Sequence, residues 1–142
     1  MRIRAKLRKE DGAAAVEFAM VAGLLFMLIF GMIEYGFAFF EMQTLRGAAR
    51  EGAREAAVGG TDSDIQNRIV EASAGALPPG FSGWHPEPAD RCDSGGNPDE
   101  SVLVQITGPY PSNVQQAFQL DIPFFPPMTL DPTIEGSFRC EE

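Results

Sequence analysis

The sequence predicts an α+β protein in which a long N-terminal transmembrane helix leads into a small antiparallel sheet domain with a short helix. Residues 13–40 are almost wholly apolar, residues 41–58 contain no proline, and residues 61–142 alternate short apolar segments with turn residues. A helix of 28 residues is about 42 Å long, and a bilayer core is about 30 Å thick. We therefore divide the chain into a basic leader (1–12), a span with its extension beyond the membrane (13–60), and a small outer domain (61–142).

The charge is placed unevenly along the chain, whose formal net charge is −9. The leader holds five basic residues, whereas residues 61–142 hold thirteen acids and only three arginines. Basic residues before a span favour a cytoplasmic N-terminus, which puts the outer domain on the far side of the membrane. A nucleic-acid partner is not expected, because no basic face exists beyond the leader.

The apolar run is too long for a secretory signal, whose apolar part has about 7–15 residues. A plain membrane anchor would leave Glu17 unexplained, because a carboxylate inside an apolar helix is costly and points to a function. Cleavage after Gly12, where the backbone is permissive, would give Ala13 a new ammonium group. That group could pair with the Glu17 carboxylate of a neighbouring subunit, since each charge would otherwise be uncompensated in lipid.

The segment DGAAAVEFAM, which holds Gly12, Ala13, Glu17 and Phe18, resembles the processing site of type IV pilins, and of tight-adherence pseudopilins in particular. FGMIEYGFAFF and GAAREGAREAAV resemble the span and following helix of TadE-like proteins of the Flp pilus system. The resemblance covers residues 8–58 well and the rest loosely. Glu17-Phe18 is a conservative departure from the Glu-Tyr that is frequent in the Flp-type pattern.

This resemblance implies that a prepilin peptidase cuts between Gly12 and Ala13. It implies a TadE-like pseudopilin or minor subunit that acts in assembly of an Flp-type pilus, without catalysis and without a cofactor. The expected location is the inner membrane, with the outer domain in the periplasm or outside the cell. The expected partners are other pilin or pseudopilin subunits and the inner-membrane assembly platform.

Small residues recur along the span at Ala15, Ala19 and Gly23, and Gly31 continues the stripe. Small residues at this spacing let membrane helices approach closely, so we predict helix–helix contact there. Glu34 has two readings, a second contact between subunits or an interfacial acid that precedes an aromatic belt. The belt would consist of Tyr35, Phe37, Phe39 and Phe40.

The extension beyond the span carries a row of arginines, Arg46, Arg50 and Arg54, and Glu51 can pair with Arg54 on one face of the helix. Gly59-Gly60 is expected to end the helix. A second face is made of small residues and is suited to close packing. We interpret it either as part of a solvated stalk or as a contact with a pilin helix or partner subunit. Its members are Leu45, Ala48, Ala49, Gly52, Ala53, Ala56 and Ala57.

The outer domain is expected to begin with a helix over Ser63–Ala74, capped by Thr61 or Asp62. A proline-rich stretch, IPFFPPMTLDP, carries Phe124, Phe125 and Met128 as apolar anchors. The remaining expected elements are a short strand near Pro88–Cys92, a strand over Ser101–Thr107, a helical turn over Asn113–Leu120 and a final strand over Thr133–Cys140.

Both cysteines, Cys92 and Cys140, lie in the outer domain. In an oxidising compartment we expect them to form one intramolecular disulfide, and the alternatives are two free thiols or a bridge between subunits. A zinc site that adds His85 lacks the usual ligand spacing. An acidic turn offers oxygen ligands for calcium but does not match an EF-hand, so an ordinary acidic loop is the other reading. Its residues are Asp90, Asp93, Asn97, Asp99 and Glu100.

Two rival functions remain open. One is a membrane-tethered periplasmic ligand-binding or enzymatic domain with an uncleaved N-terminal anchor. It needs a polar cluster in residues 61–142, where the acidic turn is the one candidate. The other is an unprocessed membrane scaffold for another secretion machine.

Overall fold

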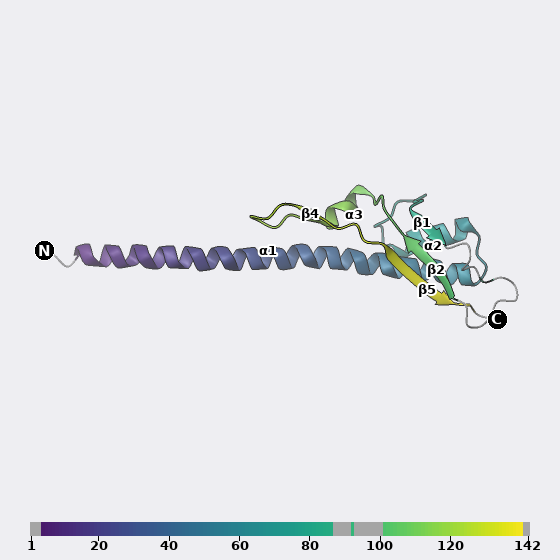
Figure 1. The fold of residues 1–142 in the computed structure, drawn as a ribbon, viewed down its shortest axis with the longest axis horizontal. Helices are drawn as coiled ribbons and strands as arrows, with labels where there is room; N and C mark the ends of the chain where they lie inside the picture. The colour runs from purple at the N-terminus through teal and green to yellow at the C-terminus, as the bar shows by residue number, and fades with distance from the viewer. Residues whose placement is uncertain (1–3, 87–91, 93–100, 141–142) are drawn as a thin grey trace.

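The computed structural model describes residues 4–86, 92 and 101–140, and side chains from residue 12 onward. One helix, α1 (Arg4–Ala57), has 54 residues and is therefore about 80 Å long. A small domain packs against the C-terminal part of α1 and leaves the N-terminal part bare (Figure 1). This arrangement confirms the predicted α+β class with a long N-terminal apolar helix.

The domain contains a three-stranded antiparallel sheet of β1 (Trp84–Pro86), β2 (Ser101–Ile106) and β5 (Ile134–Arg139). The strand order is β1-β2-β5, so β2 is central. Every second side chain of β2, at Val102, Val104 and Ile106, is buried. This alternation is what a strand with one buried face requires.

The core forms because α1 packs against β5, β2 and the second helix, α2 (Asp62–Ala72). The small-residue face of α1 is the centre of this contact, and Leu45, Ala48, Ala49 and Ala53 are completely buried. Both sequence interpretations of this face, a solvated stalk and a surface for a partner subunit, are therefore wrong. The outer part of α1 is the support on which the chain's own sheet and α2 pack.

The predicted cap of α2 is Thr61, whose side chain accepts a hydrogen bond from the backbone N–H of Asp64. The Asp64 carboxylate accepts one from the N–H of Thr61 in return, which completes a capping box. Hydrogen bonds from Thr61 lower the pKa of Asp64. The helix thus begins where the sequence predicted, and Ile65 and Ile69 are buried.

An ion-pair network joins α1 to α2 on the surface of the domain. A carboxylate oxygen of Glu51 lies 3.8 Å from a guanidinium nitrogen of Arg54 and 3.7 Å from one of Arg68. The first pair confirms the prediction for Glu51 and Arg54. Pairs this exposed contribute at most about 1 kcal/mol, so apolar packing supplies most of the helix–helix contact.

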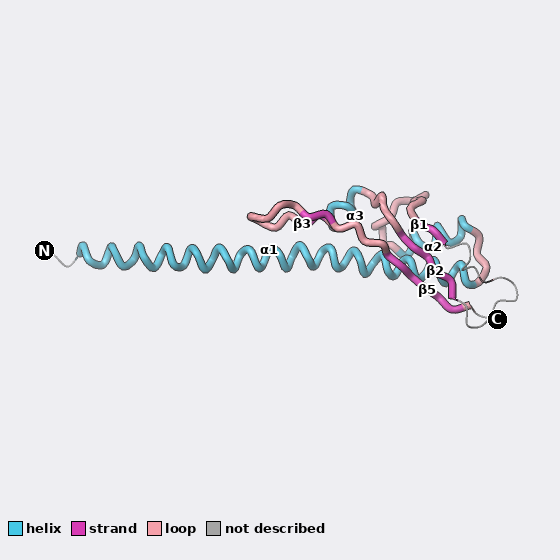
Figure 2. Tube along the Cα trace, viewed as in Figure 1, coloured by secondary structure: helices cyan, strands magenta, loops and turns pink. Residues whose placement is uncertain are grey.

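A two-stranded hairpin leaves the domain after a short helix, α3 (Ser112–Ala117). Its strands, β3 (Gln119–Leu120) and β4 (Met128–Thr129), are antiparallel. The hairpin and its loop run back beside α1 toward the N-terminus (Figure 2). The predicted helical turn over Asn113–Leu120 thus ends early, because its last residues join the hairpin.

The first strand of the sheet was not predicted from the sequence. It lies at Trp84–Pro86 and pairs with β2 so that Trp84 faces Ile106, whereas the predicted strand near Pro88–Cys92 falls almost wholly outside the described residues. The strands predicted over Ser101–Thr107 and Thr133–Cys140 are found as β2 and β5 with slightly shorter bounds.

The predicted disulfide joins Cys92 to Cys140, with their Cα atoms 5.7 Å apart. This distance lies within the ordinary range for disulfides. The bond fastens the chain just beyond β5 to a segment 48 residues earlier. β5, which ends at Arg139 next to Cys140, points away from the bare part of α1 (Figure 1).

Candidate functional site

The expected processing motif lies in the bare part of α1. Gly12, Ala13, Glu17 and Phe18 are all exposed, and Phe18 is 74 % exposed. A Cβ atom placed on Gly12 would meet nothing within 4 Å. The helix is continuous through the Gly12–Ala13 bond. Glycine weakens a helix at that point.

The predicted packing stripe divides into two parts. Ala15, Ala19 and Gly23 are exposed and touch no other element, so this surface is open to lipid or to another helix. Gly31 and Glu34 are half-buried, and they belong to the side of α1 on which Met27 and Ala38 are also covered. Gly31 lines a groove beside the chain's own hairpin. Ala15, Ala19 and Gly23 stay exposed.

The two acids of the apolar segment, Glu17 and Glu34, have no ion pair or hydrogen bond to any described residue. Large apolar side chains surround them along the whole segment, and most are more than half exposed. Among the side chains that the structure describes, none compensates the charge of these two carboxylates. A partner in the membrane could do so, as the sequence interpretation of Glu17 requires.

The arginine row of α1 is exposed on the surface of the domain. Arg46, Arg50 and Arg54 are exposed. Of the three, Arg54 alone forms an ion pair with a described residue, Glu51. The row therefore belongs to the outer surface of the domain, next to the membrane end.

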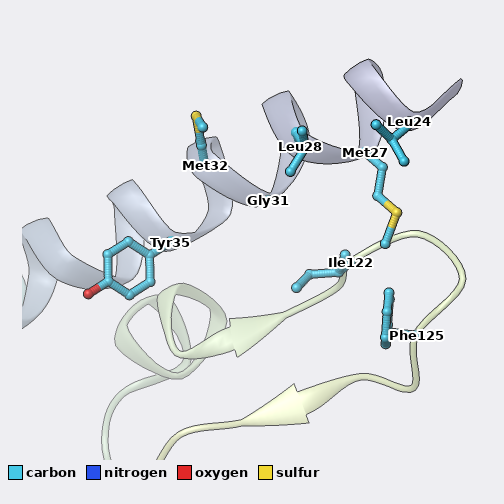
Figure 3. Close-up of a pocket in the computed structure, with 8 residues that line it drawn as sticks. All are labelled: Leu24, Met27, Leu28, Gly31, Met32, Tyr35, Ile122 and Phe125. Atoms are coloured by element: carbon cyan, nitrogen blue, oxygen red, sulfur yellow. The ribbon is translucent and has the colours of Figure 1, made fainter. Parts of the chain in front are cut away.

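A hydrophobic groove of about 600 Å³ lies between α1 and the hairpin loop. Met27 points from α1 toward the loop that holds Phe125, and Ile122 lies between the hairpin and the helix (Figure 3). The groove was not predicted from the sequence, although the apolar residues of the proline-rich stretch were noted there as anchors. The α1 side of the groove is formed by Leu24, Met27, Leu28, Gly31, Met32 and Tyr35.

The sequence offered two candidate metal sites, one for zinc and one for calcium. Cys92 and Cys140 are bonded to each other, so neither offers a thiolate to zinc beside His85. The calcium candidates Asp90, Asp93, Asn97, Asp99 and Glu100 lie outside the described residues. Among the residues that are described, no group of three or more metal-ligating side chains comes together.

The arrangement indicates a membrane-anchored protein, because one described helix is long and apolar enough to cross a bilayer and a small domain packs against its far end. The model of the TadE-like protein family matches residues 12–54. The match begins at the expected cleavage site and ends within the buried face of α1, so this part of α1 is similar to TadE-like proteins, as the sequence predicted. The match supports the assignment of the chain as a protein associated with the Tad pilus. No curated protein and no solved structure was found to match the chain.

Proposed function

We propose that this chain is a TadE-like pseudopilin, a minor subunit that acts in assembling an Flp-type adhesive pilus without catalysis. One observation carries the proposal: the TadE-like match covers the same part of α1 in which the processing motif and the small-residue stripe are exposed. A subunit that associates through its membrane helix needs this part of the helix to be free of its own domain.

The proposed sequence of events starts in the inner membrane, with the leader in the cytoplasm and the outer domain in the periplasm. A prepilin peptidase cuts after Gly12, which removes the basic leader and creates the ammonium group of Ala13. The Glu17 carboxylate of a neighbouring pilin or pseudopilin pairs with this ammonium, while Ala15, Ala19 and Gly23 bring the two helices close together.

The processing step is tested by the intact mass of the protein from native membranes. The mature chain should begin at Ala13, and Gly12→Phe should retain the leader and lower the number of surface pili. Gly36→Phe is the matched control, because Gly36 is an equally open glycine of the same helix. A mature wild-type protein that begins at Met1 or Arg2 contradicts the proposal.

A further inference from the structure

The hairpin loop reaches the part of α1 that the membrane covers. If the span begins at Ala13, the roughly 20 residues that cross a bilayer end near Met32. The groove between α1 and the loop is lined on the helix side from Leu24 to Tyr35. Phe125 of the loop lies near Met27 (Figure 3), five residues or about 7 Å below Met32 along the helix. Interfacial segments enter a bilayer to about 5–10 Å, which is the same depth.

The chemistry of the loop suits lipid. The chain carries no charged residue from Ile122 to Leu130, while Asp121 and Asp131 stand at the two ends of this segment. Phe124 is 97 % exposed, and Phe125 and Met128 are 59 % and 62 % exposed. These side chains gain almost nothing from the fold of their own domain, and an exposed apolar cluster of this kind marks a contact surface.

The backbone of the loop is also adapted to an apolar surrounding, in which each unpaired N–H group is costly. Pro123, Pro126 and Pro127 have no N–H group at all. The N–H of Phe125 donates to the carbonyl oxygen of Ile122 at 3.1 Å, and the strands beside the loop pair with each other. A proline-rich loop therefore brings few free donors into lipid.

We infer that the tip of the hairpin, residues 122–128, is a second membrane anchor, whose Phe124, Phe125 and Met128 insert into the outer leaflet beside the chain's own span. The occupant of the surface is lipid, because the loop faces the same bilayer that α1 crosses and its apolar surface continues that of the span. The loop then fixes how deep α1 sits and places Glu34, two residues beyond Met32, at the headgroup level. This inference depends on the membrane span and is independent of the pilus function.

The test uses the full chain in liposomes of neutral phospholipid, with one nitroxide label per protein. Cysteine labelling is specific, because both native cysteines are bonded to each other. Phe124→Cys carries the label in the loop, and Asn67→Cys, on the exposed side of α2, is the matched control. Met128→Cys repeats the measurement at a second site of the hairpin. The relaxation of each label is measured with oxygen, which concentrates in lipid, and with a water-soluble nickel complex.

At Phe124→Cys we expect strong relaxation by oxygen and at least about fivefold less relaxation by nickel than at Asn67→Cys. Equal nickel access at the two positions would overturn the inference, because the loop would then lie in water. A label shielded from both reagents, with broadening that grows with the protein-to-lipid ratio, would also overturn it, because the occupant would then be a second copy of the chain.

Discussion

Gly136 of β5 crosses α1 directly against the backbone of Ala49. A Cβ atom on Gly136 would lie 2.4 Å from the carbonyl carbon of Ala49 and 2.4 Å from the amide nitrogen of Arg50. Real Cβ atoms do not approach other atoms so closely, and a helix backbone cannot move aside as a side chain can. The contact joins the last strand to the part of α1 that follows the membrane span.

We therefore expect Gly136→Ala to destabilise the outer domain by about 3 kcal/mol, because β5 must move away from α1 to make room. The measurement is urea unfolding of the full chain in detergent micelles, followed by the fluorescence of Trp84, the one tryptophan of the chain. A loss below about 0.5 kcal/mol would show that β5 does not lie against α1 as closely as the structure has it.

A second glycine, Gly52 of α1, makes room for α2. A Cβ atom on Gly52 would lie 2.5 Å from a side-chain carbon of Ile69. We expect Gly52→Ala to cost about 1–2 kcal/mol in the same unfolding experiment, since Ile69 must shift. Gly47→Ala is the control on the same helix: its Cβ would meet nothing within 4 Å, so the better helix former should stabilise by up to about 1 kcal/mol. Equal effects of the two substitutions would contradict the close approach of α2.

Much of the fold could be predicted, because the deciding signals are local. The apolar run shows α1, the Thr61 cap shows where α2 begins, and the alternation of Val102, Val104 and Ile106 shows β2. The small-residue face of α1 could not be assigned, because alanine and glycine allow close packing against any partner. Only the long-range contact of Ala49 with Gly136 shows that the partner is the chain's own sheet.

The candidate site, like the fold, could be predicted from the sequence only in part. The sequence alone predicts Gly12 and Glu17 as processing residues, because their spacing is a local pattern, and the structure adds that both are exposed. The hairpin could not be predicted, because its strands are two residues long and its prolines suggest irregular structure. Phe125 faces the span because of the direction in which the hairpin leaves the domain. No local sequence pattern specifies that direction.

The disulfide should decide much of the stability of the outer domain. Joining Cys92 to Cys140 closes a loop of 48 residues, for which chain entropy gives roughly 4 kcal/mol. We expect reduction, or the double substitution Cys92→Ser with Cys140→Ser, to lower the free energy of unfolding by about this amount. Thiol counting on denatured, unreduced protein should find no free thiol. Two free thiols, or a dimer that disappears with reductant, would contradict the intramolecular bond.

Tyr110 makes the domain sensitive to high pH. Burial, and then the negative charge of Asp131, raise the pKa of Tyr110 to about 12 from its ordinary 10.0. The hydroxyl lies against the carbonyl oxygens of Ile106, at 3.1 Å, and Pro132. Because the pKa is raised on folding, this contribution to stability is complete below pH about 10 and is lost as the pH rises toward 12.

Unfolding by urea at a series of pH values checks this expectation. The free energy of unfolding of the wild-type protein should fall between pH 10 and 12. Tyr110→Phe should be about 1 kcal/mol less stable at pH 7, because one hydrogen bond is lost. It should also show a clearly smaller fall above pH 10. If Tyr110→Phe loses as much stability as the wild type there, another group is responsible.

The exposed acid Glu17 should act in association and not in insertion. Removing a charge from the span removes a cost of insertion, so Glu17→Gln should remain fully in the membrane fraction. The proposed pair with the Ala13 ammonium of a neighbour is lost, although the side chain keeps its size. We expect crosslinked oligomers in native membranes, and surface pili, to fall at least about tenfold. An unpaired buried charge costs more than the roughly 1.4 kcal/mol that corresponds to a tenfold change in an association constant.

Val21→Ala, an exposed position of the same helix away from the small-residue stripe, is the control and should assemble normally. Wild-type levels of oligomers and pili with Glu17→Gln would refute the pairing role.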